Sequence, residues 1–409
     1  MADLVRINRD RLARRLSEMA KIGATPAGGV TRLAFTDLDK EGRDLFIRWC
    51  EARELSVRID EMGNIFARYG ADDQPPVMAG SHLDSQPQGG KYDGAYGVLA
   101  AFEAVETLMD AGITPSRPIE AVCWSNEEGS RFPPPMIGSG VFAGLFDRDD
   151  AYARESRDGK KQGDELARIG YRGESACRAG DIHRYFELHI EQGPVLDQKG
   201  LRIGIVEGVY GLKWLELTIR GEANHAGATP MEVRRDALAA AAEIITRAER
   251  LPADMGGNFR LTVGYIAASP NSTNVIPGEV VFTVDVRSEG QEGVEALARS
   301  VTDIADEIAS RRNVELEIQT LSDNAPVTFA PECRDLVEQM AAALELPRQR
   351  MHSGPGHDAV YLSHVCPTGM IFVPSIDGIS HNEYEETTPD DLAAGADVLA
   401  NVLRQSAET

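Results

Sequence analysis

The chain is organised around the stretch Gly80-Ser81-His82-Leu83-Asp84-Ser85-Gln86-Pro87-Gln88-Gly89-Gly90-Lys91-Tyr92-Asp93-Gly94. It follows a short apolar run and precedes a segment of helical character from Tyr96 to Leu108. We therefore expect His82 and Asp84 where a strand ends, and Asp93 on a glycine-flanked loop that leads into a helix. Ligands bind outside the carboxyl ends of strands in open α/β sheets, and imidazole and carboxylate groups bind divalent metals. The stretch predicts part of a metal site.

Three further segments with the character of buried strands end in residue types that bind metals. The segments are 119–124, 185–190 and 368–373, and the residues are Glu127, Glu128, His189 and His381. The alternation of such strands with helical segments, including 6–20, 39–55 and 332–345, predicts a largely parallel, buried sheet. Each residue alone would suit a packed or solvated polar group, but four such placements in one domain indicate a shared site.

Two adjacent glutamates can divide the work of hydrolysis. Because Glu127 and Glu128 point in different directions, one can bind metal while the other faces a water molecule as general base. A bound divalent metal lowers the pKa of such a water to about 7 and polarises a carbonyl group. Asp93 is the candidate for a carboxylate that bridges two metals. Asp84 can accept the second ring N–H of His82 and fix its tautomer.

Length and composition limit the classes of function. The 409 residues exceed the ~250–300 at which a single core stops growing, so two domains are expected. A net charge of −23 argues against binding to nucleic acid or anionic membranes. The five cysteines have no paired spacing, Met1–Asn8 contains no apolar leader, and no apolar run approaches the ~20 residues of a membrane helix. We therefore expect a cytoplasmic protein without a nucleic-acid or membrane partner.

The character of the chain changes at about Gly211. Strand patterns at 213–221, 260–266, 280–287 and 314–319 combine with helix patterns at 235–250 and 291–311. The order β-α-β-β-α-β is that of a ferredoxin-like α+β unit. We predict a discontinuous catalytic domain over residues 1–211 and 329–409, interrupted by an inserted domain over residues 212–328. The polar segment 145–182 predicts surface helices.

Five motifs in this chain resemble those of a known family. They are Gly-Ser-His-Leu-Asp-Ser-Gln-Pro (80–87), Gly-Gly-Lys-Tyr-Asp-Gly (89–94), Asn-Glu-Glu-Gly-Ser-Arg-Phe (126–132), His-Ile-Glu-Gln-Gly-Pro (189–194) and Gly-Ile-Ser-His-Asn-Glu (378–383). Together they resemble the hydantoinase/carbamoylase branch of the aminoacylase-like dinuclear metallohydrolases. That branch contains N-carbamoyl-L-amino acid amidohydrolase, β-ureidopropionase and allantoate amidohydrolase. The resemblance covers nearly the whole chain.

The resemblance implies a metallopeptidase-like catalytic domain with two divalent metal ions per subunit. Zinc is the first choice, and manganese, cobalt or nickel would also suit histidine and carboxylate ligands. By resemblance, one metal is held by His82, Asp93 and His189, and the other by Asp93, Glu128 and His381. The general base is Glu127, and Asp84 supports His82.

The resemblance also implies a set of substrate-binding residues. Gln192 contacts the carbamoyl end, His225 and Asn274 stabilise the oxyanion, Arg287 pairs with the substrate carboxylate, and Gly356 contributes its backbone. In this family, His225 serves the site of the neighbouring subunit. The inserted domain both forms the homodimer and closes over the substrate, so residues near 211 and 329 are expected to act as hinges.

The implied activity is hydrolysis of the carbamoyl C–N bond of N-carbamoyl-L-amino acids to the amino acid, carbon dioxide and ammonia. The alternatives are β-ureidopropionase, then allantoate amidohydrolase, then a hydrolase of N-acyl amino acids or dipeptides. A metal-independent binding or scaffold protein on the same fold is an alternative from another class. The presence of all five ligand positions together with Glu127 argues against it, because a binding module needs no base.

Some residues have no assigned role at this stage. His357 and Asp358 are compatible with a helix cap, and His183, His352 and His364 are expected to be structural or on the surface. One departure from the family pattern is the segment Phe132-Pro133-Pro134-Pro135-Met136, which carries more prolines than expected. It puts the local loop shape, and with it the substrate pocket, in question.

Overall fold

A computed structural model describes residues 4–71 and 73–408 of the chain. The chain divides into two compact units. The first contains the residues up to Glu207 and from Phe329 onward, and the second is Gly208–Thr328. The predicted insertion, 212–328, ends at the same residue and starts slightly later. The first three residues of the N-terminal segment, in which we expected no leader, lie outside the described residues.

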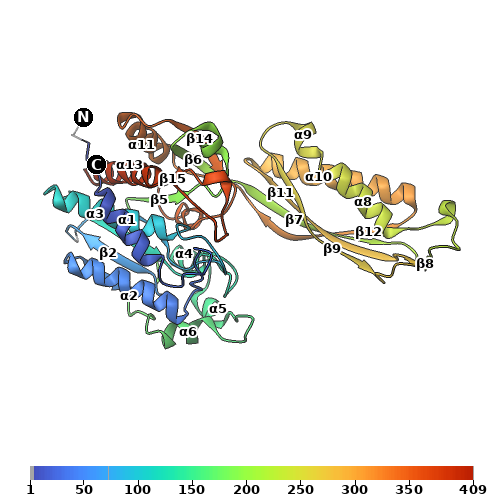
Figure 1. Ribbon diagram of the computed structural model, residues 1–409, viewed down its shortest axis with the longest axis horizontal. Helices are drawn as coiled ribbons and strands as arrows, with labels where there is room; N and C mark the ends of the chain where they lie inside the picture. The colour runs from blue at the N-terminus through green and yellow to red at the C-terminus, as the bar shows by residue number, and fades with distance from the viewer. Residues whose placement is uncertain (1–3, 72, 409) are drawn as a thin grey trace. The chain divides into compact units, whose positions relative to one another are not determined.

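The first unit is an α/β domain (Figure 1). Its elements, together with the short strand β13, which belongs to the same sheet, are α1 (Arg9–Met19), α2 (Asp37–Ala52), β1 (Ser56–Ile59), β2 (Ile65–Tyr69), β3 (Val77–His82), α3 (Ala95–Asp110), β4 (Ile119–Trp124), α4 (Ile137–Phe142), α5 (Arg148–Ala153), α6 (Gln162–Arg168), β5 (Arg184–Ile190), α7 (Val195–Lys199), β6 (Ile203–Val209), β13 (Val327–Thr328), α11 (Pro331–Ala343), β14 (Arg348–Ser353), α12 (Asp358–Leu362), β15 (Thr368–Val373), η2 (Ile376–Gly378) and α13 (Pro389–Glu408).

The described residues of this sheet form nine strands in the order β1-β2-β4-β3-β5-β15-β6-β13, with β14 paired to β6. The central strands β4, β3, β5 and β15 are parallel, whereas β1, β2, β6 and β13 pair in antiparallel fashion at the two sides. The predicted, mainly parallel sheet is therefore confirmed for its centre. Since the four parallel strands are neighbours, their carboxyl ends meet at one edge of the sheet.

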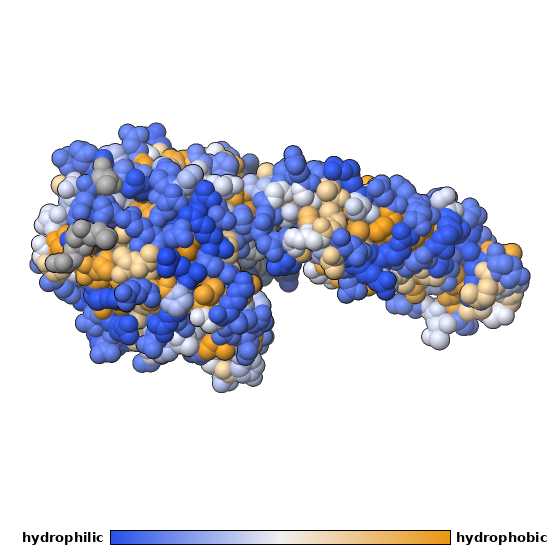
Figure 2. All heavy atoms as spheres, turned by 90° about the horizontal axis from the view of Figure 1, so that it is seen from above, coloured by the Kyte–Doolittle hydropathy of each residue, from blue (hydrophilic) through white to orange (hydrophobic). Residues whose placement is uncertain are grey.

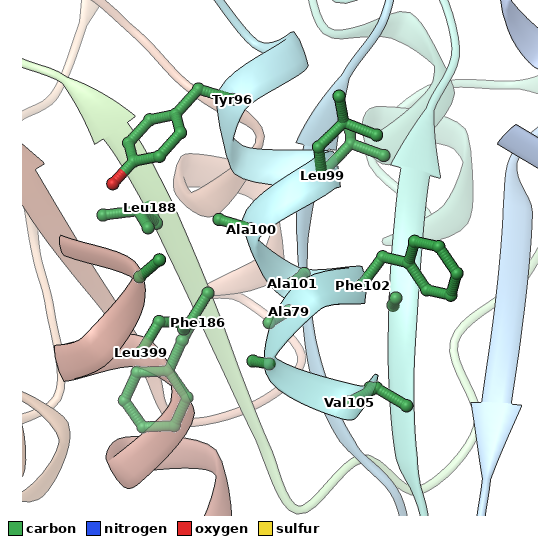
Figure 3. Close-up of a cluster of buried hydrophobic side chains, with 14 of the residues drawn as sticks. Ala79, Tyr96, Leu99, Ala100, Ala101, Phe102, Val105, Phe186, Leu188 and Leu399 are labelled. Atoms are coloured by element: carbon green, nitrogen blue, oxygen red, sulfur yellow. The ribbon is translucent and has the colours of Figure 1, made fainter. Parts of the chain in front are cut away.

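The core of the first unit lies between this sheet and the helices α3 and α13. Almost every residue of α3 is buried, and Figure 3 shows its side chains among those of β5 and α13. Alternate residues of β5 point to opposite faces. Phe186 and Leu188 enter this core. On the other face, Glu187 accepts the N–H of Ala359 at 2.8 Å, so α12 covers the side on which His189 points.

The elements that were not predicted from the sequence include β6, β14 and α13. Helix α13 is buried on most sides. Two of its buried polar residues hold the N-terminal segment, because Asp397 accepts the N–H of Ile7 at 2.9 Å and Asn401 accepts that of Val5 at 3.0 Å. The segment 145–182 contains the short helices α5 and α6, but Leu166 is buried, so it is not purely a surface segment.

The second unit has the predicted ferredoxin-like order. Its elements are β7 (Gly211–Arg220), β8 (Asn224–His225), η1 (Met231–Val233), α8 (Ala237–Ala248), α9 (Leu251–Met255), β9 (Arg260–Ser269), β10 (Val275–Ile276), β11 (Glu279–Ser288), α10 (Gln291–Arg312) and β12 (Glu315–Asn324). The sheet order is β12-β7-β11-β9, and every pair is antiparallel. Buried and half-buried residues alternate along β11, and α8 and α10 cover the buried face (Figure 1).

The surface is in keeping with the acidic composition. The face drawn in Figure 2 is mostly hydrophilic, with apolar residues in small groups. All five cysteines are buried as free thiols. Among residues 4–71 and 73–408, no helix has both the length and the apolar character that a membrane span requires.

Candidate metal centre

Five of the predicted residues meet at the edge of the sheet where the parallel strands end. His82 ends β3 and His189 lies near the end of β5, whereas Asp93, Glu128 and His381 lie on loops. Among the described residues, potential ligand atoms of His82, Asp93 and His189 lie within 4.8 Å of one another. Those of Asp93, Glu128 and His381 do so as well. The two predicted ligand sets are therefore each brought together.

Asp93 belongs to both groups and offers one carboxylate oxygen to each. Its Oδ1 lies 3.7 Å from Nε2 of His82 and 3.2 Å from Nε2 of His189. Its Oδ2 lies 3.3 Å from Nε2 of His381, and that nitrogen is 3.6 Å from Oε2 of Glu128. Imidazole nitrogens and carboxylate oxygens in this arrangement fit a pair of divalent cations that share one carboxylate.

Main-chain carbonyl groups fix the orientation of the two buried imidazoles. Nδ1 of His82 lies 2.8 Å from the carbonyl oxygen of Asp84, and Nδ1 of His189 lies 2.9 Å from that of Ile190. Because a carbonyl oxygen only accepts, each Nδ1 carries a proton, so in the neutral ring the lone pair is on Nε2, the nitrogen that faces Asp93. The rings are held as metal ligands need to be.

Asp84 supports the site differently from our expectation for its carboxylate. The main-chain oxygen of Asp84 accepts the ring N–H of His82, while its Oδ1 is 3.9 Å from that nitrogen. The carboxylate instead accepts the backbone N–H groups of Glu127 and Glu128, each at 3.2 Å. Asp84 therefore ties the strand end that carries His82 to the turn that carries both glutamates.

That turn directs the two glutamates to different partners. It begins at Asn126, which has a left-handed φ of 53° and donates its side-chain amide to the carbonyl of Phe132 at 2.8 Å. Both oxygens of Glu128 accept hydrogen bonds from Gln86, at 2.9 Å from its main-chain N–H and at 2.7 Å from its side chain. Oε2 of Glu127 lies 3.5 Å from Nε2 of His82, which belongs to the first ligand group, His82, Asp93 and His189.

The electrostatics of the cluster suit these roles. Burial lowers the pKa of His82 to about 4, so its imidazole is neutral at neutral pH, as a metal ligand must be. Burial opposes ionisation of Asp93, but its interactions with the imidazoles of His189 and His381, whose own pKa values it raises, outweigh this and hold the pKa of Asp93 well below its ordinary value. Burial and neighbouring carboxylates raise the pKa of Glu127 well above its ordinary value, which favours acceptance of a proton.

A glycine is needed where Asp93 enters α3. Gly94 has a φ of 63°, in the left-handed region that favours glycine. A Cβ atom at this position would overlap the imidazole ring of His82. The glycine at position 94 therefore lets the Asp93 loop approach His82 closely.

Two of the predicted substrate residues lie in the first unit. Gln192 donates its side-chain amide to Oδ2 of Asp93 at 3.1 Å, so the structure places it at the ligand cluster. Gly356 lies between β14 and α12, and a Cβ atom there would be 3.1 Å from Cε of Met136. The proline-rich segment that ends at Met136 therefore packs against the loop that contains Gly356.

The other predicted substrate residues lie in the second unit. His225 and Asn274 are joined by the short pairing of β8 with β10, where the N–H of Ala226 donates to the carbonyl of Asn274 at 3.0 Å. Nδ1 of His225 accepts the N–H groups of Gly227 and Ala228 at 3.0 and 3.1 Å, so its exposed Nε2 carries the proton in the neutral ring.

Arg287 is not part of this pairing. It lies near the other end of β11, on the half-buried face, and its guanidinium is paired with Asp285 at 2.9 Å. The structure therefore joins His225 and Asn274 within the second unit and places Arg287 apart from them.

Sequence reasoning missed several polar residues next to the ligands. The ring of His357 lies 4.6 Å from that of His189, centroid to centroid, and its side chain makes no capping hydrogen bond to α12. Gln86 and Glu385 bond directly to ligand residues. A signal was available only for Glu385, because the N–H groups of a buried glycine-rich loop need nearby acceptors. His183, His352 and His364 are half-buried or exposed, as expected.

The chain is similar to known proteins in both sequence and structure. The sequence profile of Peptidase family M20/M25/M40 matches residues 78–405. An N-carbamoyl-L-amino-acid amidohydrolase of Rhizobium meliloti is 46% identical over 410 residues, which cover 98% of this chain and 97% of that protein. An allantoate amidohydrolase of Escherichia coli is 36% identical, with 98% of each chain covered. A crystal structure of an amidase of the hydantoinase/carbamoylase family from Burkholderia multivorans superposes with a TM-score of 0.95 at 46% identity, covering 98% of both chains.

Proposed function

The chain belongs to Peptidase family M20/M25/M40 and to its hydantoinase/carbamoylase amidases, and from this premise we propose that it hydrolyses N-carbamoyl-L-amino acids. The products are the amino acid and carbamate, which decays to carbon dioxide and ammonia. The observation that carries the proposal is the 46% identity, over nearly the full length of both chains, to an N-carbamoyl-L-amino-acid amidohydrolase.

The ligand cluster supplies the metal-binding part of the proposal. His82, Asp93 and His189 would hold one divalent ion, and Asp93, Glu128 and His381 the other, with zinc as first choice and manganese, cobalt or nickel as substitutes. When bound, such ions lower the pKa of a water molecule and polarise the substrate carbonyl.

The proton is carried by Glu127. Its raised pKa and its place beside His82 let it accept a proton from the attacking water and pass it to the departing nitrogen. A carboxylate that both accepts and returns the proton leaves the enzyme unchanged after one turnover. Asp84 keeps Glu127 in place through the backbone N–H of that residue.

The remaining residues bind the substrate. The side-chain amide of Gln192 would contact the carbamoyl end of the substrate, and Gly356 would contribute its backbone to substrate binding. Nε2–H of His225 and the amide of Asn274 would donate to the oxyanion. Arg287 would pair with the substrate carboxylate. Gln192 and Arg287 already have carboxylate partners, Asp93 and Asp285, so the substrate must compete with both.

We propose a homodimer formed through the inserted unit. His225 and Asn274 adjoin the end of β11 that starts at Glu279, and Arg287 lies eight residues further along this strand, about 26 Å away. One small substrate cannot span that distance, so the two sets would act on one substrate only from different subunits. The edge strand β9, with Tyr265 and Ile266 exposed, is a surface suited to such pairing.

Molar mass in solution, measured by light scattering after size exclusion, tests this homodimer directly. A monomer that turns over substrate would contradict it. The cytoplasmic location expected from the sequence stays a prediction.

A second candidate activity is hydrolysis of allantoate, because relatives at 36% identity from Escherichia coli and Bacillus subtilis carry that name. β-Ureidopropionase differs from the first proposal by one methylene in the substrate, which a pocket discriminates by only about 1–3 kcal/mol. Hydrolysis of N-acyl amino acids or dipeptides comes last among the alternatives.

The deciding experiment measures ammonia release after loading with zinc or manganese. The substrates are N-carbamoyl-L-amino acids, N-carbamoyl-β-alanine and allantoate, with N-acetyl amino acids and dipeptides assayed for the released amine. The proposal expects the highest kcat/KM for an N-carbamoyl-L-α-amino acid. Preference for allantoate or for the β-alanine derivative would replace it, and turnover of dipeptides alone would move the enzyme to the peptidases of the family.

A further inference from the structure

The segment that follows His381 packs against the loop that carries Asp93. At its centre is Glu385, a residue 1% exposed to solvent. One oxygen of Glu385 accepts the backbone N–H groups of Tyr92 and Asp93, at 3.2 and 3.1 Å. The other accepts the hydroxyl of Ser380 at 2.8 Å. A single buried carboxylate therefore joins two loops, and each loop carries a predicted metal ligand.

The space around this carboxylate is closely fitted. A Cβ atom on Gly90 would overlap the carboxylate group of Glu385. Gly90 does not have a positive φ, so its side chain is missing for reasons of space and not of backbone conformation. The glycine-rich loop is thus shaped to receive Glu385, and the carboxylate satisfies N–H groups that would otherwise be buried without partners.

The two predicted metal positions depend on these loops to different degrees. His82 and His189 lie on strands of the central sheet, so two ligands of the first group are held without the loops. In the second group, Asp93 and His381 both lie on loops that Glu385 joins. The His381 side chain is 49% exposed, and its φ of 51° is a conformation that non-glycine residues rarely adopt without support.

We propose that Glu385 is a positioning residue that fixes Asp93 and His381 relative to each other and thereby forms the second metal position. This inference rests on the metal roles proposed above and is independent of the substrate. Glu385 acts through the ligands and touches neither the substrate nor the reacting atoms. Its function is to supply three accepted hydrogen bonds at one point between two loops.

Neighbouring Glu386 provides a matched control. It also reaches the Asp93 loop, since its oxygens bind Lys91 at 2.6 Å and the hydroxyl of Tyr92 at 3.1 Å. Its side chain is 45% exposed, however, and it bonds side chains and not the backbone beside Asp93. Removal of its charge should leave both metal positions intact.

The test uses the full-length Glu385→Ala, Glu385→Gln and Glu386→Gln variants. Zinc content is measured after dialysis, zinc affinity by competition with a chelator, and site geometry by the visible spectrum of the cobalt-loaded protein. Glu385→Ala should retain the first ion and bind the second about 10–100-fold more weakly. Glu385→Gln should retain both ions, because an amide oxygen can accept the same two backbone N–H groups. Glu386→Gln should match the wild type.

If Glu385→Ala binds both zinc ions with wild-type affinity, the inference is overturned and the proposed function still stands. Equal weakening of both ions would also overturn it, because that is the mark of general destabilisation. If Glu385→Ala does not fold, Ser380→Ala decides, since it removes only the link to the His381 loop. Unchanged second-ion affinity in Ser380→Ala would overturn the inference. A wild-type protein that binds a single ion would overturn the proposed metal pair and this inference with it.

Discussion

The ligand cluster of the first unit and the predicted substrate residues of the second unit are built in opposite ways. The side chains of His82 and His189 are 2% and 1% exposed, and each ring is oriented by a main-chain carbonyl group. His225 and Asn274 are exposed, and their hydrogen bonds are made within their own loops and between β8 and β10. All the predicted metal ligands except His381 are thus held in the interior of a domain, whereas His225 and Asn274 lie on the surface of the second unit.

The difference has a physical cause. Metal ligands must be deprotonated and closely spaced, which is costly unless buried hydrogen bonds hold them. Substrate-binding groups gain from exposure before binding, because they can exchange water for the ligand. A substitution in the cluster should therefore remove chemistry or metal, and one in the second unit should weaken binding or turnover without loss of metal.

The largest effect is expected from Glu127→Gln, which separates chemistry from metal binding inside the cluster. An amide cannot accept the proton of the attacking water, so kcat should fall by about 10³-fold or more. Both ions should remain, because Glu127 is in neither ligand group. Ammonia release and metal content measure the two properties. The exposed variant Glu174→Gln serves as control, and wild-type turnover in Glu127→Gln would show that another group is the base.

The next effect tests the second unit by mixing subunits. His225→Ala and Arg287→Ala should each lower kcat/KM by about 10²-fold or more. If His225 and Arg287 act on one substrate from different subunits, co-expression of the two variants should restore activity at about one quarter of the sites, because half of the dimers then contain one complete site. Metal content should be normal in both variants. Absence of restoration in verified mixed dimers would mean that both residues act in one subunit, or that one of them does not act.

The sequence predicted the cluster better than its supports. His82, Glu128, His189 and His381 could be found because ligand types stood at the ends of strand patterns, and parallel strands bring their ends together. Gln86 and Glu385 could not be found in this way, because they are common polar residues on loops. Their roles arise from contacts with residues 42 and 292 positions away in the chain.

A similar limit applies to the fold. Alternation along 280–287 was enough to predict β11, because one of its faces is buried. The pairing of β8 with β10 involves two residues on each side, too few for a period to appear. Helix α13 was missed for a different reason than a weak pattern, because Leu392, Leu399 and Leu403 recur along it at helical spacing.

A smaller effect is expected from Gln86→Ala, which tests whether the hydrogen bond from Gln86 to Glu128 supports metal binding. The variant removes the side-chain donor to Oε2 of Glu128 but keeps the main-chain N–H to Oε1. The ion held by Asp93, Glu128 and His381 should bind about tenfold more weakly, and the other should be unchanged. Zinc competition measures both affinities, with the exposed Gln198→Ala as control. Equal affinities in variant and wild type would mean that Glu128 needs no support from Gln86.

The smallest effect is expected from Met136→Ala, which asks whether the first unit also selects the substrate. Met136 closes the proline-rich segment and packs against the backbone at Gly356, where the substrate is expected to bind. Shortening this side chain enlarges the space beside Gly356. The ratio of kcat/KM for N-carbamoyl-L-phenylalanine to that for N-carbamoyl-L-alanine should therefore rise by about tenfold, the scale on which a pocket discriminates a few methylene groups. Metal content is the internal control, because Met136 belongs to neither ligand group and the substitution keeps its main-chain hydrogen bond to Glu127. An unchanged ratio of kcat/KM with normal metal content would assign selection of the substrate side chain to the second unit. The first unit would then bind metal without contributing to substrate specificity.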